Sequence, residues 1–156
     1  MEQGAWNVVE RSDGHLVATY KNVFVTMWWA PARVEQLRGL PAHQDEMGRR
    51  WPGGWGTLAV LGADAGKISA EVRAEGERIT KHQKQGMRAI AQVIEGTGFG
   101  AAAVRSVASA LTLFKRSGPP TKIFDALGPG VAWLMHELGT PADAPALLKA
   151  LRAART

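Results

Sequence analysis

The sequence contains no cysteine, and this absence removes several kinds of chemistry at once. Without thiols the chain has no disulfide bonds, no thiolate zinc sites and no cysteine nucleophile. The absence also fits a reducing compartment. The N-terminus, "MEQGAWNVVERSDG", has no basic segment followed by an apolar one, so we predict no signal peptide. No apolar run reaches the roughly 18 residues that a membrane span needs, so we expect no membrane partner and a cytoplasmic location.

Motifs for catalysis or metal binding are also missing from the sequence. The four histidines have no zinc-site spacing: His15, His43, His82 and His136. Ser106 and Ser109 fall within a predicted helix and outside any G-x-S-x-G motif. We therefore predict a protein that is not an enzyme and that carries no metal and no cofactor.

The composition that is present is that of an ordinary globular domain. The chain has 156 residues, of which 46% are apolar and 21% charged, so we predict a single domain over residues 1–156. The net charge is +5, but acids and bases alternate in segments such as "EVRAEGERITKHQKQ". This mixing favours a solvated, mildly basic surface over a dedicated basic face.

An opening antiparallel hairpin is predicted over residues 6–29, "WNVVERSDGHLVATYKNVFVTMWW". Two β-favouring runs flank Asp13-Gly14, a pair that favours a tight type I′ turn. We expect the second run to form one long strand. Apolar residues at helical spacing then predict a helix over residues 32–40, which Pro41 ends or kinks.

Strands and helices alternate in the rest of the chain. The strands are expected at residues 57–63, 87–95 and 121–124. Helices are expected at residues 70–85, 100–115 and 146–155, and a further helix follows the last strand and ends near residue 138. The predicted order is β-β-α-β-α-β-α-β-α-α, which indicates the α/β class, a mixed sheet with helices packed on it. Residues 143–155 are expected to be a C-terminal appendage of the domain.

The segment "VIEGTGFGAAAVRS" contains a glycine turn that resembles a nucleotide-binding motif, with Gly96, Gly98 and Ala101 fitting G-x-G-x-x-A. A dinucleotide site also needs an acid about 20 residues further on, and none stands there. Glu95 would in addition repel a pyrophosphate. We therefore predict a tight strand-to-helix corner and no bound dinucleotide. A smaller alternative stays open, in which Gly96, Thr97, Gly98 and Arg105 form a rim for an anion or a partner.

The order of these motifs resembles the STAS domain of bacterial anti-sigma-factor antagonists, in its stand-alone form with an extended N-terminal hairpin. The matching segments cover most of residues 6–138: "YKNVF", "TLAVLGADAGKISAEVR", "VIEGTGFGAAAVRS" and "TKIFDALGPGVAWL". The resemblance implies a STAS-like sheet, a partner kinase or regulator, and a phosphoacceptor hydroxyl at the start of the helix after residue 69. Ser69 stands at that place, although "GKISAEV" departs from the usual phosphosite pattern. From the residues alone, Ser69 is a helix N-cap.

Two basic segments, "KHQKQGMR" and "KRSGPPTK", fall where helices end and strands begin. Cations there complement helix C-termini, so we do not expect nucleic acid as a partner. The leading hypothesis is a regulatory protein-interaction module that docks through the loops around Ser69 and residues 96–100. The alternative is a protein that binds a small anion or a lipid-type ligand beside the sheet. The hairpin also leaves a free sheet edge, so a homodimer is a further hypothesis.

Overall fold

The structure, a computed structural model, describes residues 5–65, 68–82, 84–96, 105 and 118–155. These residues form a six-stranded sheet whose strand order follows the chain. The strands are β1 (Trp6–Ser12), β2 (His15–Tyr20), β3 (Val23–Trp28), β4 (Trp55–Leu61), β5 (Met87–Ile94) and β6 (Thr121–Phe124). Neighbours from β1 to β3 are antiparallel and neighbours from β3 to β6 are parallel. The predicted mixed sheet is confirmed.

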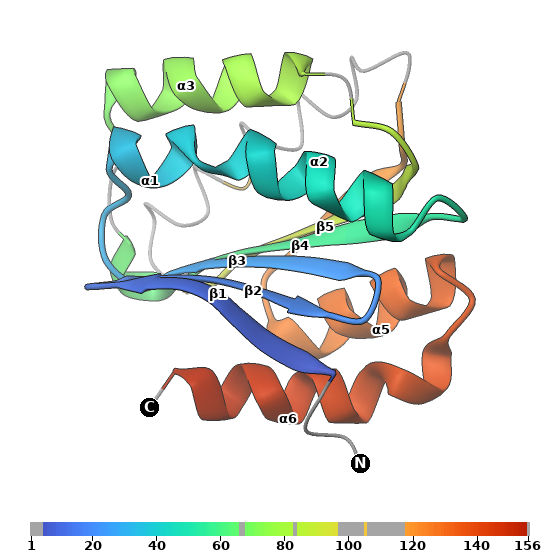
Figure 1. Cartoon of the computed structure of the whole chain (residues 1–156). Coiled ribbons are helices and arrows are strands. Elements are labelled where there is room, and N and C mark those ends of the chain that lie inside the picture. The colour runs from blue at the N-terminus through green and yellow to red at the C-terminus, as the bar shows by residue number, and fades with distance from the viewer. Residues whose placement is uncertain (1–4, 66–67, 83, 97–104, 106–117, 156) are drawn as a thin grey trace.

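Helices cover both faces of the sheet (Figure 1). The helices α1 (Val34–Arg38), α2 (Leu40–Arg50) and α3 (Ala70–Lys81) lie on one face. The helices α5 (Leu127–Glu137) and α6 (Ala144–Ala154) lie on the other face. Two short 3₁₀ turns complete the described elements: η2 (Ala63–Ala65) precedes α3 and η3 (Pro141–Asp143) precedes α6. The α/β class is thus confirmed. In the described part of the chain, none of the helices has the length and apolar character needed to cross a membrane.

The predicted order of elements is wrong at its start, because the long second strand is in fact two strands. Tyr20 pairs with Val23, so Lys21 and Asn22 form a two-residue turn between β2 and β3. Lys21 adopts a positive φ of 49°, a conformation that usually indicates glycine or asparagine. Every residue of β2 and β3 is buried, so the apolar pattern continues through both strands and conceals the reversal between them.

The first turn and the first helix also differ in detail from the prediction. The tight turn at Asp13-Gly14 is confirmed, because Ser12 pairs with His15. The predicted type I′ geometry is wrong, because a type I′ turn needs a positive φ at both central residues and only Gly14 has one, at 74°. The chain breaks at Gly39 between α1 and α2, and Pro41 lies in the first turn of α2. Proline is tolerated there because a first-turn amide has no partner within the helix.

Two apolar layers hold the helices against the sheet. On the α5 and α6 side, Leu134, Leu147 and Leu151 are fully buried. On the α1–α3 side, Phe24 and Trp55 are fully buried and their rings meet edge to face at 6.5 Å. Each such side chain contributes about 1.5–3 kcal/mol relative to an exposed one. The sheet is therefore a rigid platform, and the ends of its strands are where the loops gather.

Because β3, β4, β5 and β6 run in the same direction, their carboxyl ends lie on one side of the sheet and their amino ends on the opposite side. We call the side where β3, β4, β5 and β6 end the carboxyl edge, and the side where they begin the amino edge. In Figure 1 the carboxyl edge lies at the left and the amino edge at the right. Ligands and partners of open α/β sheets commonly bind beyond the carboxyl ends of the strands.

Candidate functional site

Ser69 lies on the carboxyl edge at the start of α3. Its backbone is extended (φ −67°, ψ 161°), and its Oγ accepts a hydrogen bond from the backbone N–H of Val72 at 3.1 Å. The predicted N-cap is confirmed, and it stabilises the helix by about 1 kcal/mol. The residue is exposed, so the hydroxyl of this cap is accessible from solvent.

The surroundings of Ser69 combine an apolar side chain with an acid. Ile68 directly precedes it and is one of three large hydrophobic side chains that are exposed in the described residues, at 37%. Glu71 lies in the first turn of α3 and complements the helix dipole. An exposed apolar side chain and an exposed serine therefore lie side by side at the start of α3.

The predicted anion rim is only partly described, and one guanidinium nitrogen of Arg105 bonds to the backbone. Thr97 and Gly98 lie outside the described residues. Gly96 leaves β5 with a φ of 116°, so a glycine is needed there. The Nη1 of Arg105 donates to the backbone carbonyls of Ile94 at 2.8 Å and Gly96 at 3.0 Å. This nitrogen therefore holds the end of β5.

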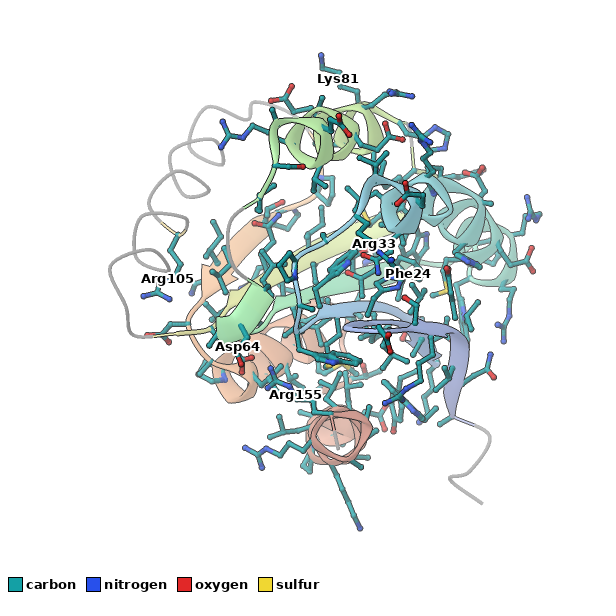
Figure 2. The ribbon with its side chains drawn as sticks, turned by 90° about the vertical axis from the view of Figure 1, so that its left-hand side faces the viewer. Phe24, Arg33, Asp64, Lys81, Arg105 and Arg155 are labelled. Carbon is teal, nitrogen blue, oxygen red and sulfur yellow. The ribbon has the colours of Figure 1, made fainter. Side chains whose placement is uncertain are left out.

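A second arginine neutralises the acid that follows β5. Arg155, just after α6, donates from Nη1 to Oε2 of Glu95 at 2.9 Å and from Nη2 to Oε1. The hydrogen bond to Glu95 raises the pKa of Arg155 above its ordinary value, although partial burial opposes the shift. Arg11 of β1 also donates to the carbonyl of Ala154 at 3.1 Å. The end of α6 is thus fastened across the carboxyl edge, where Figure 2 shows Arg155 and Arg105 apart from each other.

A buried polar cluster that the sequence did not reveal joins the first hairpin to α1. His15 is fully buried, and its ring lies 5.0 Å from that of Trp28. The Nδ1 of His15 lies 3.3 Å from Oγ of Ser12. Gln36 donates to the same Oγ at 3.2 Å and accepts from Trp28 Nε1 at 3.0 Å. This network has no sequence signal, because its members come from four separate segments.

Burial lowers the pKa of His15 below its ordinary value. Glu10 opposes this shift and Arg33 adds to it. The Nε2 of His15 has no hydrogen-bond partner, so the ring favours the neutral form. A neutral, fully buried imidazole held between a serine and a tryptophan is suited to packing the hairpin against α1.

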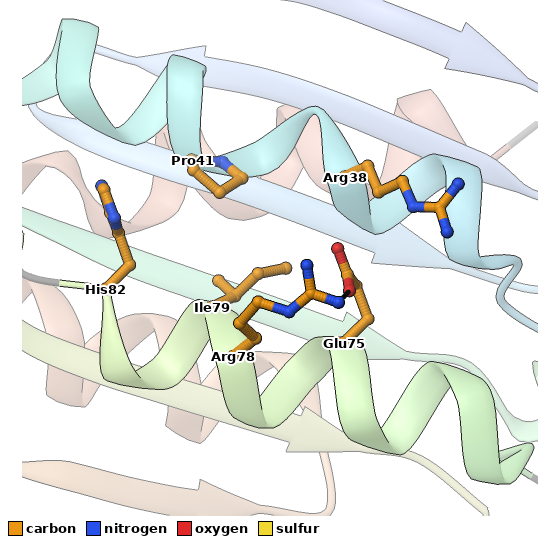
Figure 3. Close-up of a pocket in the computed structure, with 6 residues that line it drawn as sticks. All are labelled: Arg38, Pro41, Glu75, Arg78, Ile79 and His82. Atoms are coloured by element: carbon orange, nitrogen blue, oxygen red, sulfur yellow. Dashed lines mark ion pairs between the residues drawn. The ribbon is translucent and has the colours of Figure 1, made fainter.

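Between α1, α2 and α3 lies an open groove of about 300 Å³ (Figure 3). Its lining residues are Arg38, Pro41, Glu75, Arg78, Ile79 and His82. Arg78 pairs with the buried Glu75 at 2.7 Å, so much of its charge is balanced. A site for a lipid-type ligand is lined mainly by apolar side chains, whereas most residues that line this groove are charged or polar.

Among the described residues, histidines and carboxylates do not gather in any group of three or more that is placed to hold a metal ion. The carboxyl edge offers an exposed hydroxyl, an exposed isoleucine and arginines that are engaged within the protein. Comparison of the chain with protein-family models, with curated proteins and with solved structures found no significant match. The chemistry of this edge therefore has to be judged from its own residues.

Proposed function

We propose that the protein is a non-enzymatic, STAS-like regulatory module that binds a partner protein at the carboxyl edge, with Ser69 as the phosphoacceptor of the switch. The observation that carries the proposal is the position of Ser69, exposed at the N-terminus of a 12-residue helix. The sequence resemblance to STAS domains supports the same residue.

The physics of such a switch follows from the location of the hydroxyl. A phosphate on Ser69 gains from the free amides and the dipole at the start of α3. It adds close to two negative charges beside Ile68. A partner that packs an apolar surface on Ile68 would then have to desolvate the phosphate, so phosphorylation releases the partner.

The phosphorylation step is tested by incubating the protein with ATP and a lysate of the source organism, followed by intact-mass measurement. We expect wild type to gain one phosphoryl group and Ser69→Ala to gain none. Thr80→Ala is the matched control, because Thr80 is an exposed hydroxyl in the same helix, bonded to the carbonyl of Gly76. Equal labelling of Ser69→Ala and wild type would show that the acceptor lies elsewhere.

Partner binding is tested with three baits: wild type and two variants of Ser69 that differ from each other in charge. Ser69→Asn and Ser69→Asp both retain an N-cap of similar strength, so α3 is equally stable in each. We expect a protein captured by wild type and Ser69→Asn to be lost from Ser69→Asp. Capture of the same protein by all three baits would contradict a charge-operated switch at this edge.

A further inference from the structure

The amino edge, opposite to Ser69, carries several cations from different elements. We call Arg49, Arg50, Lys81, Lys84 and Arg88 the amino-edge rim. Arg49 and Arg50 end α2, Lys81 ends α3, and Arg88 lies at the start of β5. Three separate elements therefore bring basic side chains to one edge of the sheet.

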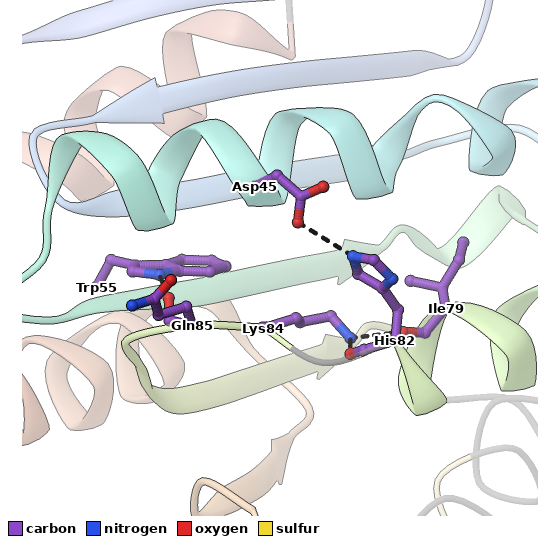
Figure 4. Close-up of polar contacts among 6 residues, drawn as sticks. All are labelled: Asp45, Trp55, Ile79, His82, Lys84 and Gln85. Carbon is purple, nitrogen blue, oxygen red and sulfur yellow. Dashed lines mark hydrogen bonds and ion pairs between the residues drawn. The ribbon is translucent and has the colours of Figure 1, made fainter.

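Close packing keeps these elements together. A Cβ on Gly48 of α2 would lie 2.9 Å from the carbonyl oxygen of Gln85, so the last turn of α2 touches the segment before β5. Trp55 donates from Nε1 to the same carbonyl at 2.8 Å (Figure 4). The side chain of Arg88 lies directly against Gly54, because a Cβ there would be 2.2 Å from Arg88 Cδ. The end of α2, the segment before β5 and Arg88 are thus held close together.

Two of the acids near the rim are engaged, whereas Glu77, one turn before Lys81 on α3, is exposed. Glu46 pairs with Arg49 at 2.7 Å, and Asp45 pairs with His82 at 3.0 Å (Figure 4). Lys84 donates to the carbonyl of His82 at 2.9 Å and so helps to end α3. These contacts leave a net positive charge on the rim.

Arg50, Lys81 and Arg88 are exposed, and no ion pair links them to another residue in the described ranges. The dipoles of α2 and α3 favour the first two at helix ends. They give no reason for Arg88, which lies on a strand. The cations at this edge therefore exceed what the helix ends account for.

The rest of the amino edge favours a flexible polyanion over a lipid surface. The large exposed hydrophobic side chains of the described part are Val8, Val9 and Ile68, and none belongs to the loop or helix ends of the rim. Pro52 and Gly53, which follow Arg50 in the chain, are exposed and present no long side chain to solvent. Trp51 lies beside them and is partly exposed. Its ring packs against the apolar layer on the α1–α3 side with Nε1 buried, so only its outer part can contact an unpaired base.

We propose that the amino-edge rim binds the sugar–phosphate backbone of single-stranded nucleic acid without reading its sequence. Arginine forms paired hydrogen bonds with phosphate oxygens, so Arg50 and Arg88 supply the main contacts and Lys81 a third. This surface lies at the other end of the strands from Ser69, so its function is independent of the proposed switch.

The test measures fluorescence anisotropy of a labelled, mixed-sequence single strand of about 20 nucleotides, longer than a typical single-strand site. With three phosphate contacts, the slope of log affinity against log salt is expected to be about −2. Arg50→Ala/Arg88→Ala should flatten the slope to about −0.7 and weaken low-salt binding by at least about tenfold. Circular dichroism checks that this surface variant folds.

The matched control is Lys149→Ala/Arg152→Ala, which removes the same charge from exposed positions on α6. It should bind like wild type; an equal loss would mean that net charge alone drives the interaction. Absence of binding, or a slope near zero, would overturn the proposal. So would equally effective competition by poly-glutamate, or equal binding to phosphatidylserine vesicles.

Discussion

At the scale of single residues, His15 is the side chain with the clearest chemical signature. A histidine that is buried and neutral has a folded-state pKa below its unfolded value. The unfolded chain therefore binds the proton more readily as the pH falls. His15 contributes to stability above about pH 6.5, the ordinary histidine value, and this contribution is lost as the pH falls below it.

We expect the free energy of unfolding of wild type to decrease from pH 7.5 to pH 5.5, by at most about 1.4 kcal/mol per pH unit for one proton. Urea titrations at both values measure the change. His15→Phe keeps a ring against Trp28 but cannot titrate, so its decrease should be smaller. The rest of the chain is the same in both proteins, so the difference between their two decreases reports His15. An identical pH dependence of the two proteins would mean that His15 is charged or exposed in the folded state.

At the scale of the elements, the turn between β1 and β2 is held by a close approach that only glycine allows. Gly14 has a φ of 74°, and a Cβ there would lie 2.3 Å from Cβ of Ala30. Its carbonyl also accepts a hydrogen bond from the backbone N–H of Trp29 at 2.9 Å. The turn therefore fixes where the chain leaves β3 and enters α1.

Gly14→Ala should destabilise the protein by more than about 2 kcal/mol, because an unfavourable φ and a backbone clash act together. Thermal and urea unfolding give the value. Gly53→Ala is the matched control, since Gly53 is a turn glycine without a positive φ, and a Cβ there would meet no described atom within 4 Å. We expect its effect to stay within about 0.5 kcal/mol. Equal effects of the two substitutions would contradict the close approach at Ala30.

The edge strand β1 bears on the homodimer hypothesis. Its pairing with β2 shifts between Val8 and Glu10, which leaves Val9 as the extra residue of a β-bulge. Val8 and Val9 are 44% and 40% exposed. A bulge bends an edge strand and interrupts its row of hydrogen-bonding groups, which is a common protection against edge-to-edge pairing. A dimer formed by joining two β1 strands thus gains no support from this geometry.

At the scale of the whole molecule, the pair of Arg155 and Glu95 ties the end of α6 to the end of β5. Both side chains are less than one third exposed, at 29% and 20%, and the contact is bidentate. Pairs of this kind are worth more than exposed ones because water screens them less.

A double-mutant cycle with Arg155→Met and Glu95→Gln should give a coupling free energy of about 1–2 kcal/mol. Urea unfolding of the four proteins measures it. Arg152→Ala, one turn earlier on the exposed side of α6, should change stability by less than about 0.5 kcal/mol. A coupling near zero would show that the pair contributes no more than a surface contact.

The sequence allowed prediction of what depends on local chemistry and missed what depends on distant partners. The N-cap at Ser69 and the turn at Asp13-Gly14 follow from residues next to them, and both are confirmed. The reversal at Lys21 was missed because its turn has no glycine and apolar residues continue on both sides. The pairing of Glu95 with Arg155 was missed because 60 residues separate them, and no periodic pattern spans that distance.

The strand order of the sheet, which repeats the order of the chain, has a consequence for how the protein is made. Each strand emerging from the ribosome finds its neighbour already present, so the sheet can grow from β1 towards β6 without waiting for a later segment. The two hairpins at the start close over two-residue turns at little entropy cost, whereas the three parallel pairings each close a loop of about 25 residues and are expected to form more slowly. In the described residues, η3 and α6 return to the first strands: Asp143 pairs with Lys21, and the carbonyl of Ala154 accepts a hydrogen bond from Arg11. The contact between α6 and β1 therefore forms after the sheet, because α6 follows all six strands along the chain.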